Sequence, residues 1–148
     1  MRFTISITGI DQAIKNLTAV AKSFGNHTRF LRTVVFSLLK KEFRNVFTTR
    51  GYGKWKPLAP STIREKQSKG FDSRPLIRTG HYQRASAGLH STRVRRNELE
   101  IISLVGYAKY HEFGTSKIPK RAVFELVADK VREQLPGLYR AYQRSQLA

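Results

Sequence analysis

Residues 27–47 read HTRFLRTVVFSLLKKEFRNVF, and this stretch decides the fold. Its apolar residues fall in pairs, from Phe30-Leu31 to Val46-Phe47, spaced about one helical turn apart. This spacing predicts a long amphipathic helix, which Asn26 can cap. Paired positions produce an apolar stripe wider than a single contact needs. We therefore expect this helix to lie across a sheet or to be covered on two sides.

Hydrophobic periodicity and turn residues predict the other elements on either side of this helix. The expected order is a strand at 2–8, helices at 12–24 and 27–47, a long Pro/Gly loop at 48–60, a short helix at 63–69, a β-hairpin at 89–105, a helix at 120–135 and a helical tail at 138–146. Short helical turns are expected at 81–86 and 107–113. Together these elements predict an α+β fold in a single domain, 1–148. A small, mostly antiparallel sheet would be packed by two N-terminal helices and a C-terminal helix.

Local signals set several of these boundaries. Thr62 with Glu65 three residues later forms a capping box, which would begin the short helix at 63–69. Pro119 suits the first turn of the last helix. Pro136-Gly137 should break or kink that helix before the tail. Gly80 and Gly114 are expected to adopt positive φ.

Length and composition exclude several classes of protein. The chain has 148 residues, of which 40% are hydrophobic, which is typical of one globular domain. It has no cysteine, so disulfide and thiolate chemistry are excluded. No apolar run is long enough to span a membrane, and the N-terminus lacks the continuous apolar core of a signal peptide. Synthesis in the cytoplasm is therefore expected.

The charge is strongly positive. Lys and Arg number 28 against 10 Asp and Glu, which gives a net charge of +18. The excess is spread along the chain and is densest at 50–78, with eight basic and two acidic residues. A polyanion partner, DNA or RNA, is one explanation. An acidic protein neighbour in an assembly, or a host whose proteins are generally basic, explains the charge equally well.

Several basic residues are candidates for contact with DNA or with another subunit. Tyr52 and Trp55 alternate with lysines as in a base-stacking platform, although a lone Trp in a polar loop favours an anchor to the core. The arginines at the hairpin tip could grip phosphates or simply be solvated. The full candidate set is Lys54, Lys56, Arg64, Lys66, Lys69, Arg93, Arg95 and Arg96.

We find little sign of catalysis. The four histidines lack the spacing of a metal site, and no cofactor motif is present. Gly51-Tyr52-Gly53-Lys54 lacks the Ser/Thr of a phosphate-binding loop, so we expect a flexible loop there. His81, His111 and Lys109 could in principle cleave RNA by acid–base chemistry, but no spacing argument supports this, and a structural role for His111 is favoured. We predict no catalytic residue, no cofactor and no metal ligand, and hence no enzyme.

Three segments carry a resemblance to a known family. They read Trp55-Lys-Pro-Leu-Ala-Pro-Ser-Thr, Pro75-Leu-Ile-Arg-Thr-Gly and Tyr107-Ala-Lys-Tyr-His-Glu-Phe-Gly-Thr, the last followed by Ile118-Pro-Lys-Arg. Their order and spacing resemble the phage virion morphogenesis proteins, which are tail-completion or neck proteins of Mu-like and related tailed phages. The resemblance covers about residues 28–135. It departs from the family where Tyr82 and Ala85-Ser86 stand in place of the usual Leu and Ser, and in the residues that follow Arg121.

The resemblance implies a structural virion protein of the head–tail junction rather than an enzyme. Such a protein assembles as a homo-oligomeric ring, with six-fold symmetry implied, between a head-side connector and tail proteins, and DNA passes through its channel. It is made in the host cytoplasm and resides in the virion. Tail completion and neck roles both fit. The resemblance gives structural roles to Trp55, Pro57, Leu58, Thr79, Gly80, Tyr107, Tyr110, His111, Gly114, Pro119 and Arg121. We also expect segment 50–78 to carry contacts with DNA or with other subunits. The alternatives are a free nucleic-acid-binding protein and, more remotely, a His-dependent nuclease.

Overall fold

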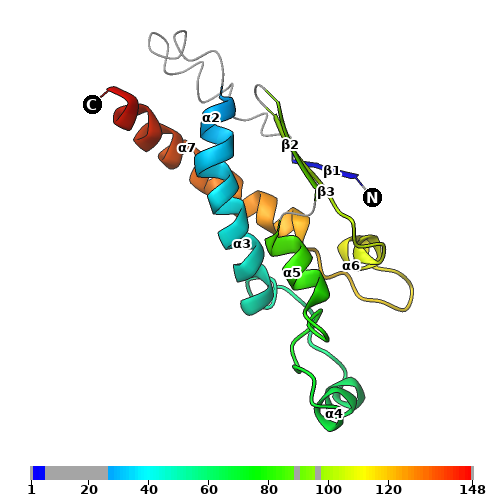
Figure 1. Ribbon diagram of the computed structural model, residues 1–148. Coiled ribbons are helices and arrows are strands. Elements are labelled where there is room, and N and C mark those ends of the chain that lie inside the picture. The colour runs from blue at the N-terminus through cyan, green and yellow to red at the C-terminus, as the bar shows by residue number, and fades with distance from the viewer. Residues whose placement is uncertain (1, 6–26, 89–90, 96–97, 148) are drawn as a thin grey trace.

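The computed structural model of this chain describes residues 2–5, 27–88, 91–95 and 98–147. Its elements are β1 (Arg2–Ile5), α2 (Thr28–Phe30), the π-helical turn η2 (Leu31–Val35), α3 (Phe36–Thr48), α4 (Pro60–Ser68), α5 (His81–Ala87), β2 (Ser91–Arg95), β3 (Glu98–Ile102), α6 (Ala108–Phe113) and α7 (Phe124–Leu147). Helices combine with an antiparallel sheet, so the predicted α+β class is confirmed (Figure 1). The predicted helix at 12–24 and the end of the strand at 2–8 lie outside the described residues. No described helix has the length and hydropathy needed to cross a membrane.

The sheet has the order β1-β3-β2, with both pairings antiparallel. Ile5 lies opposite Leu99 in one ladder, and Arg95 lies opposite Glu98 in the other. In β3, Leu99 and Ile101 are buried while their neighbours are half-buried, which is the two-residue period of a strand with one face on a core. The predicted hairpin is confirmed for its two strands, but β3 ends at Ile102 rather than at residue 105.

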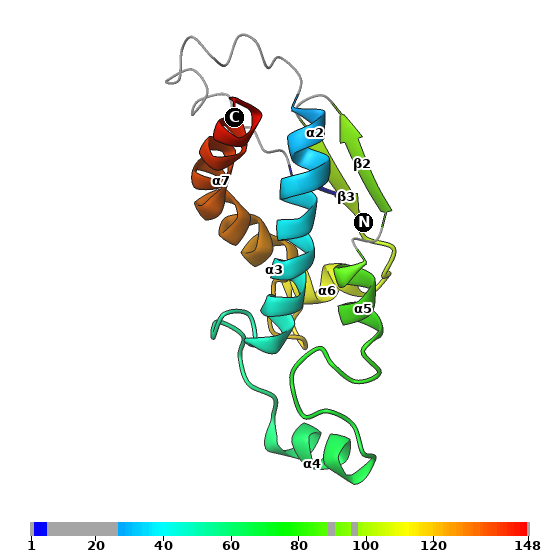
Figure 2. The same ribbon diagram turned by 60° about the vertical axis from the view of Figure 1, so that its left-hand side comes forward.

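The long helix is confirmed as a continuous run of α2, η2 and α3 from Thr28 to Thr48. Figure 2 shows this run standing between α7 and the sheet, so it is covered on two sides, as the paired apolar residues predicted. On the α7 side, Phe43 meets Phe124 and Phe30 meets Tyr139 in edge-to-face contacts, with ring centroids 5.2 and 5.1 Å apart. The wide stripe therefore serves two partners at once.

The prediction for the C-terminal part of the chain was wrong about where the last helix begins and about where it ends. A helix at 120–135 and a separate tail at 138–146 were expected, but α7 runs from Phe124 to Leu147 with Pro136 inside it. Leu135 and Tyr139 are both buried on either side of the proline. Burial of two such side chains offsets the loss of about 3 kcal/mol that an internal proline causes. The helix therefore continues past Pro136, and Figure 2 shows its axis changing direction along its length.

The start of the short helix was also wrongly placed. The helix α4 begins at Pro60, not at residue 63, and no side chain caps it. Ala59 is extended (φ −62°, ψ 145°), and a proline in the first turn is already set for the helix, so no capping box at Thr62 is needed. We call residues 57–80, which contain α4, the arm. Figures 1 and 2 both show α4 at the far end of the molecule from the sheet.

Candidate functional site

The base of the arm is anchored by Trp55. Its indole is buried against Phe47, with ring centroids 5.7 Å apart, and its Nε1–H donates to the Ala122 carbonyl oxygen at 2.8 Å. The anchor interpretation of the lone Trp is therefore confirmed. Tyr52 does not form a stacking platform with it, because the Tyr52 hydroxyl donates to Glu42 Oε2 at 2.7 Å.

The turn before Trp55 is ordered, in contrast to the flexible loop that was predicted. Gly51 N–H donates to the Val46 carbonyl at 2.6 Å, and Trp55 N–H donates to the Arg50 carbonyl at 3.1 Å. Gly51 and Gly53 take φ of 69° and 79°, the left-handed region in which glycine is favoured. These glycines serve a tight turn that places the indole.

Arg121 joins three segments that are far apart in the sequence. Its Nε donates to the Lys56 carbonyl at 2.8 Å, and its Nη2 donates to the Pro57 carbonyl at 3.2 Å. Its backbone N–H donates to the His111 carbonyl at 2.8 Å. The side chain is only 6% exposed. Pro57 thus contributes through its backbone, while Arg121 holds the start of the arm against α6.

Glu112 caps the last helix, and sequence reasoning missed this role. Its carboxylate accepts hydrogen bonds from the N–H groups of Val123 and Phe124 (2.8 and 3.1 Å, Oε2) and of Glu125 (2.8 Å, Oε1). Burial raises the pKa of Glu112, against the opposing effect of these three donors. The available signal was that residues 121–124 hold no Ser, Thr, Asp or Asn to cap the helix.

This cap explains why Pro119 does not start the helix, as had been predicted. Thr115 N–H donates to the Ile118 carbonyl at 2.8 Å, which forms a tight turn before Pro119. Gly114 has φ 74°, as predicted, and a Cβ there would lie 3.0 Å from Lys120 N. The chain then crosses to the carboxylate of Glu112, where α7 begins at Phe124.

A pocket of about 470 Å³ lies where the arm meets α5 and α6. It is lined by Leu58, Thr62, Lys66, Leu76, Ile77, Arg78, Thr79, Gly80, His81, Tyr82, Tyr107, His111 and Arg121. Six of the eleven residues to which the resemblance gives structural roles therefore line one cavity. Gly80 has φ 74° as predicted and precedes α5, which turns Tyr82 toward the core.

Two polar atoms of the pocket residues are buried without a hydrogen-bond partner, the Tyr82 hydroxyl oxygen and His111 Nδ1. The two rings are stacked, with centroids 6.4 Å apart. Burial raises the pKa of Tyr82 and lowers that of His111, and the charge of Arg121 lowers the latter further. Both side chains are therefore neutral at neutral pH.

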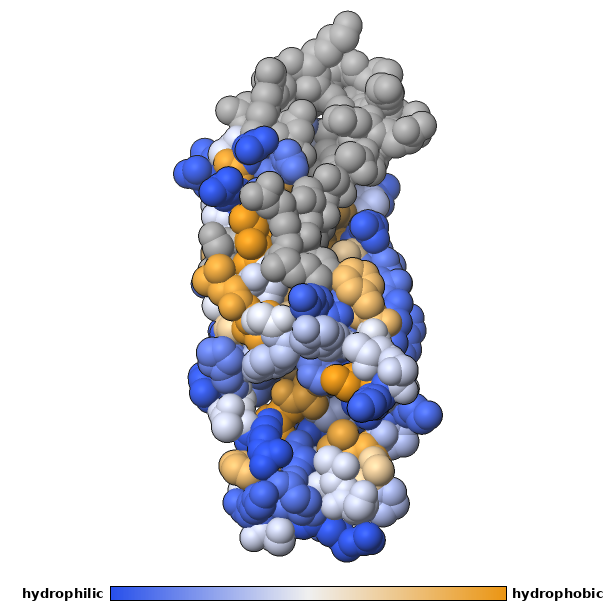
Figure 3. Space-filling model, turned by 90° about the vertical axis from the view of Figure 1, so that its right-hand side faces the viewer, coloured by the Kyte–Doolittle hydropathy of each residue, from blue (hydrophilic) through white to orange (hydrophobic). Residues whose placement is uncertain are grey.

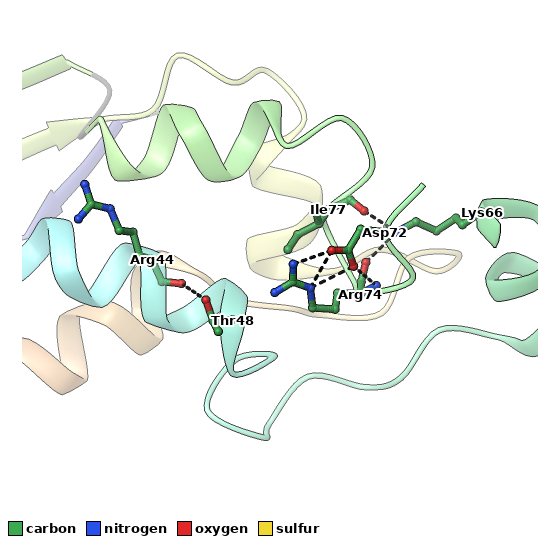
Figure 4. A network of polar contacts seen from close by, with 6 residues as sticks. All are labelled: Arg44, Thr48, Lys66, Asp72, Arg74 and Ile77. Carbon is green, nitrogen blue, oxygen red and sulfur yellow. Dashed lines mark hydrogen bonds and ion pairs between the residues drawn. The ribbon is translucent and has the colours of Figure 1, made fainter. Parts of the chain in front are cut away.

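The basic candidates do not form one patch. Lys54, Lys56 and Arg64 are exposed. Lys66, predicted as a contact residue, is 5% exposed, which corrects that prediction: its Nζ donates to the carbonyl oxygens of Arg74 and Ile77 at 2.7 and 2.6 Å (Figure 4). The ammonium group instead binds α4 to the segment that follows it in the arm, residues 70–78, which we call the returning limb.

Among the other basic candidates that the structure describes, each has an acidic residue nearby in the fold. Lys69 and Arg78 both pair with Glu65 Oε1, at 2.7 and 2.9 Å. Arg93 lies opposite Glu100 and Arg95 opposite Glu98 in the hairpin register, so glutamates partly offset their charge. Arg96 lies outside the described residues.

Of the three residues considered for acid–base cleavage of RNA, the structure brings only the two histidines to one pocket. His81 and His111 line the same pocket, whereas Lys109 is not among its lining residues and its ammonium lies over the Tyr110 ring, 5.1 Å from the centroid. No carboxylate lines the pocket. Within the described part of the chain, no three His, Cys, Asp or Glu residues gather as metal ligands.

Comparison with known proteins gives one relative and no function. No family model matches the chain, and no solved structure matches it. The chain is 29% identical over 87 residues to the uncharacterized protein MJ0331 of Methanocaldococcus jannaschii. That match covers 57% of this chain and 64% of the archaeal protein, so the chain spans less than two thirds of the relative.

Proposed function

We propose that this chain is a structural subunit of the head–tail junction of a tailed phage. It assembles there as a ring and helps join or stabilise the tail and the DNA-filled head. One observation carries the proposal: the residues that resemble the virion morphogenesis family converge on the anchor of the arm. The side chains of Trp55 and Arg121 donate hydrogen bonds to backbone carbonyls, which is a structural role rather than a catalytic one. A subunit that must reach its neighbours in a ring needs such a rigidly based projection.

Exposed apolar side chains near α6 support contacts with other subunits. Leu104 is 73% exposed and Phe113 is 68% exposed, and both Tyr107 and Tyr110 are exposed as well. We call these four residues the α6 patch. Figure 3 views the side of the molecule that carries α6 and shows orange side chains among the blue ones there. Large apolar side chains left in water are typical of surfaces that bind protein.

The proposed partners follow from the resemblance. They are identical copies in a ring, with six-fold symmetry, a head-side connector and the tail proteins, and DNA passes through the ring. The protein would reside in the virion after synthesis in the host cytoplasm. Tail-completion and neck roles are both compatible with this proposal.

Electron microscopy of a lysate from a phage that lacks this gene tests the proposal. We expect filled heads beside separate tails, and joined particles once the wild-type gene is supplied. Supplying a chain with Leu104→Ser and Phe113→Ser should fail to restore joining. Leu147→Ser removes an equally exposed apolar side chain outside the α6 patch and should restore it. Normal joined particles in the absence of the gene would overturn the proposal.

DNA contact by the free protein is the second candidate, and the exposed cations before and on α4 favour it. Lys54, Lys56 and Arg64 are exposed and, among the described residues, carry no ion pair. If these three residues contact phosphates, the logarithm of affinity should fall with the logarithm of salt concentration with a slope of about −3. Fluorescence anisotropy with duplex DNA measures this slope. A chain with all three replaced by Gln should lose the binding, and binding independent of salt would exclude this candidate.

A further inference from the structure

We propose that the pocket between the arm, α5 and α6 binds a single carboxylate group carried on an apolar stem. This assignment goes beyond a role in the head–tail junction and does not depend on it. It starts from the lining of the pocket, which holds two lysine or arginine side chains that are buried and none from Asp or Glu.

The two buried cations of the pocket form no direct ion pair. Lys66 is 5% exposed and Arg121 is 6% exposed. Among the described residues, no carboxylate oxygen lies within ion-pair distance of either side chain, and both donate to backbone carbonyls. Buried charges in proteins are normally paired, because removing an ion from water is costly. An anion in the pocket would supply a direct partner.

Asp72, which acts electrostatically on Lys66, has its carboxylate bound by another residue. Figure 4 shows Asp72 held by Arg74, whose Nη2 lies 2.6 Å from Asp72 Oδ2 and whose Nε lies 2.9 Å from the same oxygen. Burial lowers the pKa values of Lys66 and Arg121, as expected for cations without a direct ion-pair partner. Asp72 and Glu65 act on Lys66 only through space and raise its pKa, so neither pocket cation has a carboxylate bound directly to it.

Two residues that line the pocket carry a buried polar atom with no hydrogen-bond partner among the described residues. Tyr82 is 1% exposed, and its hydroxyl group has no partner among the described residues. His111 Nδ1 is similarly buried and unpartnered, and the neutral ring can carry its proton on this nitrogen. A buried polar group without a partner destabilises a fold, so these two groups gain from a ligand oxygen.

The chemistry of the walls favours a carboxylate over a phosphate. Lys66 and Arg121 each give two side-chain N–H groups to backbone carbonyls, which leaves one on Lys66 and three on Arg121. A carboxylate has only two oxygens and one charge. Leu58, Leu76 and Ile77 supply apolar surface for a stem. A glutamate side chain of a partner protein and a free aromatic or aliphatic acid share this chemistry.

The test is a titration of the full chain with sodium benzoate, followed by ¹H–¹⁵N NMR at 150 mM NaCl. Benzamide has the same ring without the charge and serves as the matched ligand control. We expect saturable shifts confined to the pocket segments 76–82 and 107–111 with benzoate and none with benzamide. Tyr82→Phe removes only the unpartnered hydroxyl, so it should keep the fold and weaken benzoate binding at least about tenfold. Arg64→Gln removes an exposed cation outside the pocket and should leave the affinity unchanged.

Other outcomes would overturn the assignment. These are equal shifts with benzoate and benzamide, an unchanged benzoate affinity in Tyr82→Phe, shifts spread over the whole basic surface, or tighter binding of inorganic phosphate than of benzoate. Comparison of benzoate with a capped Leu-Glu-Leu peptide identifies the source. Tighter binding of the peptide supports a glutamate from a partner protein, and tighter binding of benzoate supports a free acid.

Discussion

Gly51 lies directly against the indole of Trp55. A Cβ at this position would overlap the indole ring, and the backbone has φ of 69°. Gly53, two residues later, has φ of 79° but open space around its Cα. Gly53 is therefore required only by the backbone conformation. Gly51 is required by the backbone conformation and also by the close approach of the indole.

Gly51→Ala should therefore destabilise the protein more than Gly53→Ala. A left-handed alanine costs about 1–2 kcal/mol at either position. The overlap with Trp55 adds about 1–3 kcal/mol at Gly51 only. Urea denaturation followed by Trp fluorescence measures both values. Equal losses in the two variants would contradict the packing role of Gly51.

Asp72 predicts a pH effect in the arm. The hydrogen bond from Arg74 lowers the pKa of Asp72 from 3.8 to about 2. The pair therefore stabilises the folded arm above pH 3.8, and this stabilisation is lost as the pH falls through about 2. Since both side chains are about one third exposed, the effect should stay within about 1 kcal/mol.

Carboxyl ¹³C NMR measures this titration directly. We expect Asp72 to titrate near pH 2 in the wild type and closer to 3.8 in Arg74→Gln. Glu65 provides an internal reference, because its partners Lys69 and Arg78 are unchanged in that variant. If Asp72 titrates alike in both proteins, Arg74 is not the cause.

At the scale of elements, the arm depends on one lysine. Lys66 Nζ bonds two carbonyls on the returning limb, at Arg74 and Ile77. Lys66→Met should leave both carbonyls without a donor and loosen the limb, while the helical core keeps its packing. Hydrogen exchange of peptides spanning 70–78 should rise at least about tenfold, with little change in α3.

Arg64→Met is the matched control on the same helix, since Arg64 is exposed and tied to no part of the arm. Its exchange should match the wild type. If Lys66→Met exchanges no faster than this control, the returning limb is held by other contacts.

Elements with a clear period were predictable, and their ends were not. The paired apolar residues of 27–47 fixed the long helix because its burial pattern repeats over many turns. The ends of α4 and α7 depend on contacts with distant segments. Glu112 begins α7 from eleven residues away, and buried Tyr139 carries it past Pro136. A sequence pattern holds no record of such tertiary contacts, so boundary signals at Thr62 and Pro119 misled.

For the candidate site, residue types were predictable but their convergence was not. The sequence marked Trp55, Arg121 and His111 as one pattern, and the anchor role of Trp55 followed from its polar surroundings. The sequence of α4 is basic and polar, so it did not predict that Lys66 would be buried. Its burial arises because the limb after α4 folds back over it.

At the scale of the whole molecule, the net charge of +18 sets the response to salt. Like charges on a compact surface repel one another, and salt screens this repulsion. Raising NaCl from 10 to 150 mM should increase the free energy of unfolding, on the order of 1 kcal/mol. Urea denaturation at the two salt concentrations measures this, with Lys54→Glu/Lys56→Glu as the comparison. That variant should gain less from salt, and a loss of stability with salt would show that ion pairs dominate instead.

The long helix can pack against α7 only late in the synthesis of the chain. The Trp55 indole donates to a carbonyl 67 residues further along, and Phe43 packs on Phe124. While the ribosome has yet to add α7, one side of the apolar stripe of α3 faces water and the arm has no base. The nascent protein therefore exposes an apolar, strongly cationic surface until α7 has been synthesised. A chaperone would be needed during this interval.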